Sequence, residues 1–181
     1  MSNHIRLFVA VELPKLVKQE IVRVQAVLQS EHCFEGKYVN PEQAHITMKF
    51  IGSVQADQLD LIIKSLAGIS FMPCVAQLKN VGLFCTDDFI KIVYANVLAP
   101  TLPALAADLD KQLLPWCQPE QRAFVSHVTL ARVQHVEDRQ RVHDVVNALV
   151  IEPIVFEINS FVLKQSVLTQ TGPEYVTLHT Y

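Results

Sequence analysis

Hydrophobic positions along the chain follow two spacings, one typical of helices and one typical of strands. In four segments, apolar residues recur every three or four positions, which is the spacing of one buried helix face. The clearest case is 15–30, where Val17, Ile21, Val24 and Leu28 fall on one side. The pattern predicts helices over about 15–30, 56–67, 101–116 and 137–149.

Short apolar and β-branched runs between these helices predict strands. Gly52 is expected to end the strand that begins at His45, and residues 85–88 to form a hairpin connection. Residues 171–173 (Thr-Gly-Pro) are typical of a turn. The predicted strands are 6–13, 37–39, 45–51, 74–83, 90–98, 124–133, 154–163, 166–168 and 175–181.

Two of these strands carry the same triplet, His-x-Thr, at His45–Thr47 and at His127–Thr129. Residues i and i+2 of a strand point to the same face, so each copy presents an imidazole beside a hydroxyl. The chain has seven histidines among 181 residues, so two copies in matching strand patterns exceed what chance gives. The alternative is that each His is an ordinary half-buried strand residue.

The arrangement of elements predicts an α+β fold. Several neighbouring strands are joined by short turns, which favours antiparallel sheets over a parallel doubly wound sheet. The triplets lie 82 positions apart, close to half the length, and each is followed by an amphipathic helix. We therefore expect residues 1–181 to form one domain of two pseudo-symmetric lobes, with antiparallel sheets flanking a central cleft and helices outside.

Composition narrows the function classes. Half of the residues are hydrophobic and 18% are charged, which favours a large core over disorder. The net charge of −3 does not predict a broad polyanion-binding surface, so any nucleic-acid contact should be local. The four cysteines form no Cys-x-x-Cys pair, and the apolar run 7–13 is too short for a signal or membrane segment. We expect a cytoplasmic, monomeric protein with free thiols.

Five ordered blocks resemble the 2H phosphoesterases, and within them the RNA 2′,3′-cyclic phosphodiesterases, also called 2′-5′ RNA ligases. The chain differs from the usual pattern of that family at Tyr38, Lys91 and Ser126, where Trp, Arg and Pro are common. Because Lys lacks the planar fork of Arg, the sequence does not decide whether the chain contacts bases and flanking phosphates as the family does. The blocks are 6–14, 39–52, 81–84, 122–132 and 168–175.

The resemblance implies hydrolysis of RNA 2′,3′-cyclic phosphate ends, or of nucleoside 2′,3′-cyclic phosphates, to 2′-phosphates, with no metal and no cofactor. It implies that His45 protonates the 3′ oxygen and that His127 activates water, although the residues alone do not orient the pair. Histidine suits both roles because its reference pKa is about 6.5. Thr47 and Thr129 would bind the phosphate oxygens. A 5′-hydroxyl in place of water would give weak reverse 2′-5′ ligation.

Two basic residues follow the triplets. The resemblance implies that Arg132 binds the phosphate, yet strict alternation places it on the face opposite His127 and Thr129, so its role stays open. Lys49 shares the face of His45 and is expected at the rim of the cleft. Phe50 and Phe124 fit core packing. The candidates for base stacking are Tyr38, Phe84, Tyr94 and Trp116, although Trp116 also fits a role as the anchor of a helix end.

Three other functions remain possible on the residues alone. A 2′-5′ oligonucleotide phosphodiesterase would need a longer cleft. A non-catalytic nucleotide- or RNA-binding module would not require two imidazoles. A histidine metal site is disfavoured, because the chain has no His-x-His or His-x-x-x-His spacing.

Overall fold

The fold was analysed in a computed structural model, which describes residues 3–87, 89–170 and 172–181. Its helices are α1 (Lys15–Ser30), α2 (Leu59–Leu66), α3 (Leu102–Gln112) and α4 (Arg139–Ala148). Its strands are β1 (His4–Glu12), β2 (Glu35–Tyr38), β3 (His45–Gln55), β4 (Cys74–Cys85), β5 (Ile90–Leu98), β6 (His127–His135), β7 (Val155–Ile158), β8 (Val162–Thr169) and β9 (Gly172–Thr180).

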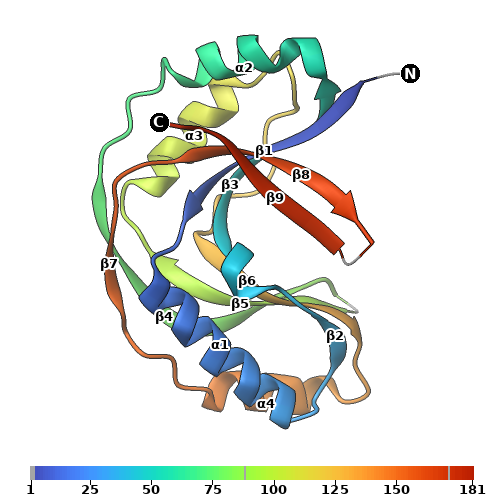
Figure 1. Ribbon diagram of the computed structural model, residues 1–181. Coiled ribbons are helices and arrows are strands. Elements are labelled where there is room, and N and C mark those ends of the chain that lie inside the picture. Colours follow the sequence, from blue (N-terminus) through green and yellow to red (C-terminus); the bar gives the residue numbers. More distant parts are fainter. Residues whose placement is uncertain (1–2, 88, 171) are drawn as a thin grey trace.

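Within the described residues, nine strands form one sheet in the order β7-β4-β5-β6-β3-β1-β8-β9, with β2 paired to β6. Every pairing between these strands is antiparallel, which confirms the predicted α+β class. The pair Ile46–Val128 joins β3 to β6. We call β1, β3, β8 and β9 the β1 half, and β2 and β4–β7 the β4 half. In Figure 1 the β8–β9 hairpin lies in the upper half of the view and β2 in the lower half.

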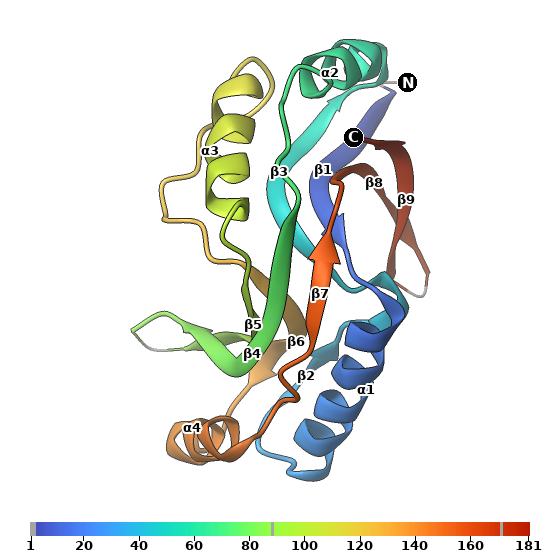
Figure 2. The same cartoon turned by 90° about the vertical axis from the view of Figure 1, so that its left-hand side faces the viewer.

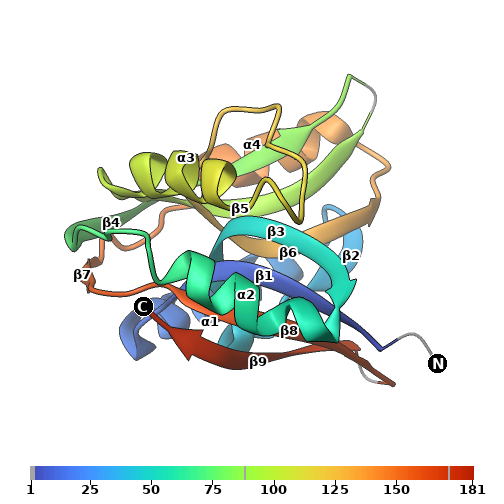
Figure 3. The same cartoon turned by 90° about the horizontal axis from the view of Figure 1, so that it is seen from above.

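The helices lie in two pairs at opposite ends of the molecule (Figures 1 and 2). α1 and α4 accompany the β4 half, and α2 and α3 accompany the β1 half. Seen from above, α2 and α3 run side by side (Figure 3), and Gln112 Nε2 donates a 3.1 Å hydrogen bond to the Ser65 carbonyl between them. No helix in the described ranges is both long and apolar enough to span a membrane.

Two helices each follow a strand of one half of the sheet but pack against the other half. α1 follows β1, yet its buried Gln25 donates from Nε2 to the carbonyls of Val39 (2.8 Å) and Leu130 (2.9 Å) beside β6. α3 follows β5, yet its Asp110 pairs with Lys49 of β3 at 2.5 Å. Each half of the sheet is therefore covered partly by a helix that begins in the other half.

The two faces of β1 belong to different clusters. Leu7, Val9 and Val11 face the main core, which lies between the sheet and the helices. Phe8 and Ala10 face the other way and form a small separate cluster with Val162 of β8. An apolar run buried on both faces explains why the strand reads as continuously hydrophobic.

Several predicted boundaries were wrong, among them the separate strand 166–168, which lies inside β8, and the strand 124–133, which begins at His127. β3 does not end at Gly52: this residue takes a φ of +89°, available to Gly, and the strand continues to Gln55. The predicted strand 154–163 is two strands, since β7 pairs with β4 and β8 with β1, on opposite sides of the sheet. α3 ends at Gln112 rather than 116.

Other boundaries agree more closely. α1 spans 15–30 as predicted. α4 begins at Arg139, where the Asp138 side chain accepts a 3.1 Å hydrogen bond from the Arg141 amide and so caps the helix. The predicted connection 85–88 and turn 171–173 each include a residue outside the described ranges, 88 and 171.

Candidate active site

The two His-x-Thr triplets lie side by side at the centre of the sheet. Ile46 and Val128 pair directly and both are fully buried in the core. The four motif side chains, His45, Thr47, His127 and Thr129, are partly buried on the opposite face, as the alternation predicts. We call this the site face.

Both imidazoles are anchored in the same way. The Nδ1 of His45 lies 2.8 Å from the Gln43 carbonyl, and the Nδ1 of His127 lies 2.7 Å from the Val125 carbonyl. A carbonyl oxygen only accepts, so each Nδ1 carries the proton and donates it. In the neutral ring, Nε2 is then the unprotonated nitrogen and can exchange a proton with a ligand.

Each imidazole also packs against two aromatic rings. His45 lies between Phe8 and Tyr175, with ring centroids at 5.0 and 5.2 Å. His127 lies against Phe84 and Tyr94 at 4.8 and 5.4 Å. Sequence reasoning missed Phe8 as a site residue, because its strand is apolar on both faces.

A glycine makes room for one of these rings. Phe84 and Tyr94 stack at 4.1 Å, and the Tyr94 ring lies across Gly82. A Cβ at Gly82 would come within 2.7 Å of the Tyr94 ring. Residues 81–84, one of the five blocks that resemble the 2H phosphoesterases, therefore help to hold the aromatic rings that pack against His127.

Burial lowers the pKa of both catalytic candidates. For His45, burial acts together with the positive charges of Lys164, Arg132 and His127, and the Nδ1 hydrogen bond opposes them. For His127, burial and the charge of Arg132 lower the pKa, again against the Nδ1 hydrogen bond. The influence of Arg132 on both rings indicates that its guanidinium lies near the two triplets.

A β-bulge brings Arg132 to the site face. On β5, Val93 pairs with Ala131 and Tyr94 pairs with Thr129, so Leu130 is the extra residue. Leu130 and Ala131 are both buried, and the next side chain, Arg132, is exposed. One extra residue reverses the alternation, so Arg132 shares the face of His127 and Thr129.

The same bulge occurs in the first triplet and corrects two predictions. Val9 pairs with Lys49 and Ala10 with Thr47, which leaves Met48 as the extra residue. Lys49 therefore turns into the interior, where it is 2% exposed, and it is not at the rim of the cleft. Phe50 turns out to the site face, where it is 54% exposed, and it is not a core residue.

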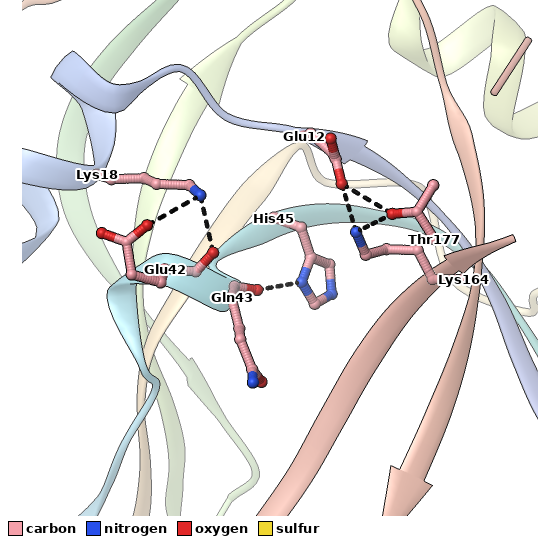
Figure 4. Close-up of polar contacts among 7 residues, drawn as sticks. All are labelled: Glu12, Lys18, Glu42, Gln43, His45, Lys164 and Thr177. Atoms are coloured by element: carbon pink, nitrogen blue, oxygen red, sulfur yellow. Dashed lines mark hydrogen bonds and ion pairs between the residues drawn. The ribbon is translucent and has the colours of Figure 1, made fainter. Parts of the chain in front are cut away.

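A charged network borders His45. The buried Lys164 ammonium contacts the Glu12 carboxylate and donates to Thr177 Oγ1 at 2.7 Å. Figure 4 shows this ammonium between His45 and Glu12. The hydrogen bond and charge of Lys164 lower the pKa of Glu12 against its partial burial.

Sequence comparison identifies the family. A profile of LigT-like phosphoesterases matches residues 11–94 and again residues 95–175. The chain belongs to the LigT-like phosphoesterase family. The resemblance to 2H phosphoesterases noted from the sequence is thereby confirmed.

Relatives of this LigT-like phosphoesterase span its length. It is 30% identical to the RNA 2′,3′-cyclic phosphodiesterase of Archaeoglobus fulgidus, over 97% of this chain and 99% of the relative. It is 28% identical to the enzyme of the same name from Methanocaldococcus jannaschii, over 94% and 96%. In structure it is similar to TT0787 of Thermus thermophilus, with a TM-score of 0.81 and 25% identity over 97% and 96% of the chains.

The site face offers groups for proton transfer and for binding an anion. Among the described residues, no group of three or more His, Cys, Asp or Glu side chains is placed to hold a metal ion. The groups on the site face of this LigT-like phosphoesterase include two Nε2 atoms for proton transfer, two hydroxyl donors and one guanidinium.

Proposed function

We propose that the chain hydrolyses RNA 2′,3′-cyclic phosphate ends to 2′-phosphates by acid–base catalysis with two histidines. The observation that carries the proposal is the matched pair of imidazoles, each with Nδ1 held by a backbone carbonyl and Nε2 left for the substrate. The names of relatives that cover nearly the whole chain support the substrate class.

In the proposed reaction, the Nε2 of one imidazole takes a proton from water, and the other imidazole protonates the leaving oxygen. Following the family resemblance, we assign His127 as the base and His45 as the acid that protonates the 3′ oxygen. Water attacks phosphorus opposite that oxygen, the P–O3′ bond breaks, and the phosphate stays on the 2′ oxygen. Each imidazole ends the step in the other's initial protonation state.

The other polar groups would stabilise charge on the phosphate. Thr47 and Thr129 can donate from their hydroxyls, and Arg132 can donate from its guanidinium, to the non-bridging oxygens where charge develops. The bulge at Leu130 supports this role for Arg132, because it turns the side chain toward the site face. A 5′-hydroxyl in place of water would form a 2′-5′ linkage, as a minor reaction in dilute solution.

We further infer that residues 1–181 are one domain of two pseudo-symmetric lobes. Each lobe would contribute one triplet, a bulge three residues after its His, and a carbonyl two residues before it. The double match of the family profile supports the same division.

The test is hydrolysis of a nucleoside 2′,3′-cyclic phosphate in the presence of a chelator, with 2′- and 3′-phosphate products resolved. We expect the 2′-phosphate alone, and loss of turnover in H45A and H127A. His135, exposed at the other end of β6, provides the control H135A, which should retain activity. Loss of activity with chelator would contradict the metal-independent mechanism.

Substrate affinity separates the enzyme from the binding module. H45A and H127A should still bind the cyclic phosphate, since Arg132 and the threonines remain. If the folded wild-type protein binds the compound without turnover, the proposal fails and a binding module is favoured. Cleavage of 2′-5′ oligonucleotides instead would favour the second enzyme class.

A further inference from the structure

A polar cavity opens beside His45 that the proposed reaction does not use. Its volume is about 120 Å³, and the side chains that matter for its chemistry are Glu12, Lys18, Glu42, His45, Lys164 and Tyr175. Two ammonium groups thus line a space that a phosphate group could occupy next to a proposed catalytic imidazole.

The Lys164 ammonium is held by two contacts, which leave one of its N–H groups for a ligand. Its residue is 8% exposed, and its Nζ contacts Glu12 and Thr177. The register places Lys164 opposite Phe8 and Thr177, so its side chain lies on the site face. An ammonium has three N–H donors, and the contacts among the described residues use two of them.

Lys18 reaches the same cavity from α1. Its Nζ donates to the Glu42 carbonyl at 2.8 Å and lies 3.5 Å from the Glu42 carboxylate. The Glu42 side chain is 82% exposed, so it can turn to solvent when an anion enters. The backbone contact would keep Lys18 in place, as Thr177 would keep Lys164 in place (Figure 4).

The direction of the proposed reaction indicates which part of the substrate lies here. Water attacks opposite the leaving 3′ oxygen, so the base and the acid lie on opposite sides of phosphorus. The leaving oxygen belongs to the sugar, and therefore the ribose lies on the side of its acid, His45. The groups attached to that ribose then extend over the β1 half, where the cavity is.

We propose that Lys18 and Lys164 form a subsite for the phosphodiester on the 5′ oxygen of the reacting ribose, so that the preferred substrate is a strand end rather than a bare nucleoside cyclic phosphate. This inference rests on the proposed function. A phosphodiester carries one negative charge shared by two non-bridging oxygens, and these match the two remaining N–H donors, one on each ammonium. Glu12 keeps Lys164 oriented, while Glu42 limits the net positive charge when the subsite is empty.

The experiment compares kcat/KM for three substrates: a nucleoside 2′,3′-cyclic phosphate, the same compound with a 5′-phosphate, and a dinucleotide that ends in a 2′,3′-cyclic phosphate. We expect the dinucleotide to exceed the nucleoside by about tenfold, the effect of charge-assisted hydrogen bonds. In K18Q/K164Q the ratio should fall to about one. K164R, which keeps the charge, should preserve most of the preference when Lys18 is unchanged.

Matched controls separate the subsite from general charge effects. Lys15 lies exposed on the same helix as Lys18, and K15Q should leave the ratio unchanged. Equal kcat/KM for all three substrates, or an equal fall for all three in K18Q/K164Q, would overturn the subsite. A preference for the 5′-monoester alone would overturn the strand end as its occupant. No turnover of any substrate would instead refute the proposed function.

Discussion

The hydrogen bonds from each Nδ1 to a carbonyl decide which nitrogen of each imidazole can act. Both carbonyls stand two residues before the histidine, where the chain enters the motif strand. The tautomer is thus set by the backbone, and no carboxylate is needed to orient the ring. The same hydrogen bonds raise the pKa of each ring, but burial and nearby cations outweigh them.

The pH dependence should reflect these lowered pKa values. A lower pKa lets the base stay neutral down to a lower pH. It also makes the acid lose its proton at a lower pH. Both limbs of the pH–rate profile therefore shift to lower pH. We expect a bell-shaped profile of kcat/KM with its optimum below 6.5, the ordinary value for histidine. An activity that continues to rise above pH 7 would contradict this.

Arg132 should contribute to the reaction and little to the fold. It is exposed, and R132M should lower kcat/KM by roughly ten- to a hundredfold, the cost of losing hydrogen bonds from a charged group. R132K should recover only part of this, because Lys cannot present two parallel donors. R141M, on α4, is the control. A large fall in the Tm of R132M, with the same fall absent in R141M, would show a structural role for Arg132 instead.

At the level of elements, the two bulges explain what the sequence could and could not predict. Alternation correctly places His45, Thr47, His127 and Thr129 on one face, because these residues precede the extra residue in each strand. Beyond Met48 and Leu130 the same rule gives the wrong face for Lys49, Phe50 and Arg132. No residue type marks these bulges, since both extra positions are ordinary apolar side chains.

The break between β7 and β8, within the predicted strand 154–163, could not be predicted from local sequence either. Its residues are suited to strands throughout, and pairing partners decide the break: β7 is bound to β4, and β8 is bound to β1. Local patterns predict α1 and β5 well because a single face of each is buried. They do not predict which half of the sheet an element joins.

The ion pair between α3 and β3 gives a prediction at this scale. The Lys49 side chain is 1% exposed and contacts Asp110 at 2.5 Å and the Gln118 carbonyl at 2.8 Å. D110A should destabilise the fold by about 2–4 kcal/mol, because it removes the nearer of two carboxylates from a buried ammonium and leaves only Glu120, at 3.8 Å. K49M should cost less, because the Asp110 carboxylate that it leaves behind is 26% exposed and can be hydrated. Urea unfolding of both variants measures the difference, and equal losses would contradict it.

For the whole molecule, the crossing of α1 and α3 between the halves predicts cooperative unfolding. Neither half keeps its helix cover without the other, so thermal unfolding should be a single transition with equal calorimetric and van't Hoff enthalpies. Fragments 1–98 and 99–181 each contain strands of both halves and should be unfolded when separate. Two resolved transitions would show that the halves are independent.

The two ends of the described chain are both tied to the segment around α2. The Asn3 carbonyl accepts a hydrogen bond from the Ala56 amide, and the Tyr181 hydroxyl donates to the Ile63 carbonyl. The ends are nevertheless far apart, because β1 and β9 each pair antiparallel with β8 and so run parallel to each other. Val162 pairs with both Ala10 and Thr180, which puts the C-terminal end beside the end of β1 and not beside its start. Figure 1 shows the two termini on either side of α2. A linker that joined them would have to run back along a whole strand, so a circular permutant would need a long crossover connection.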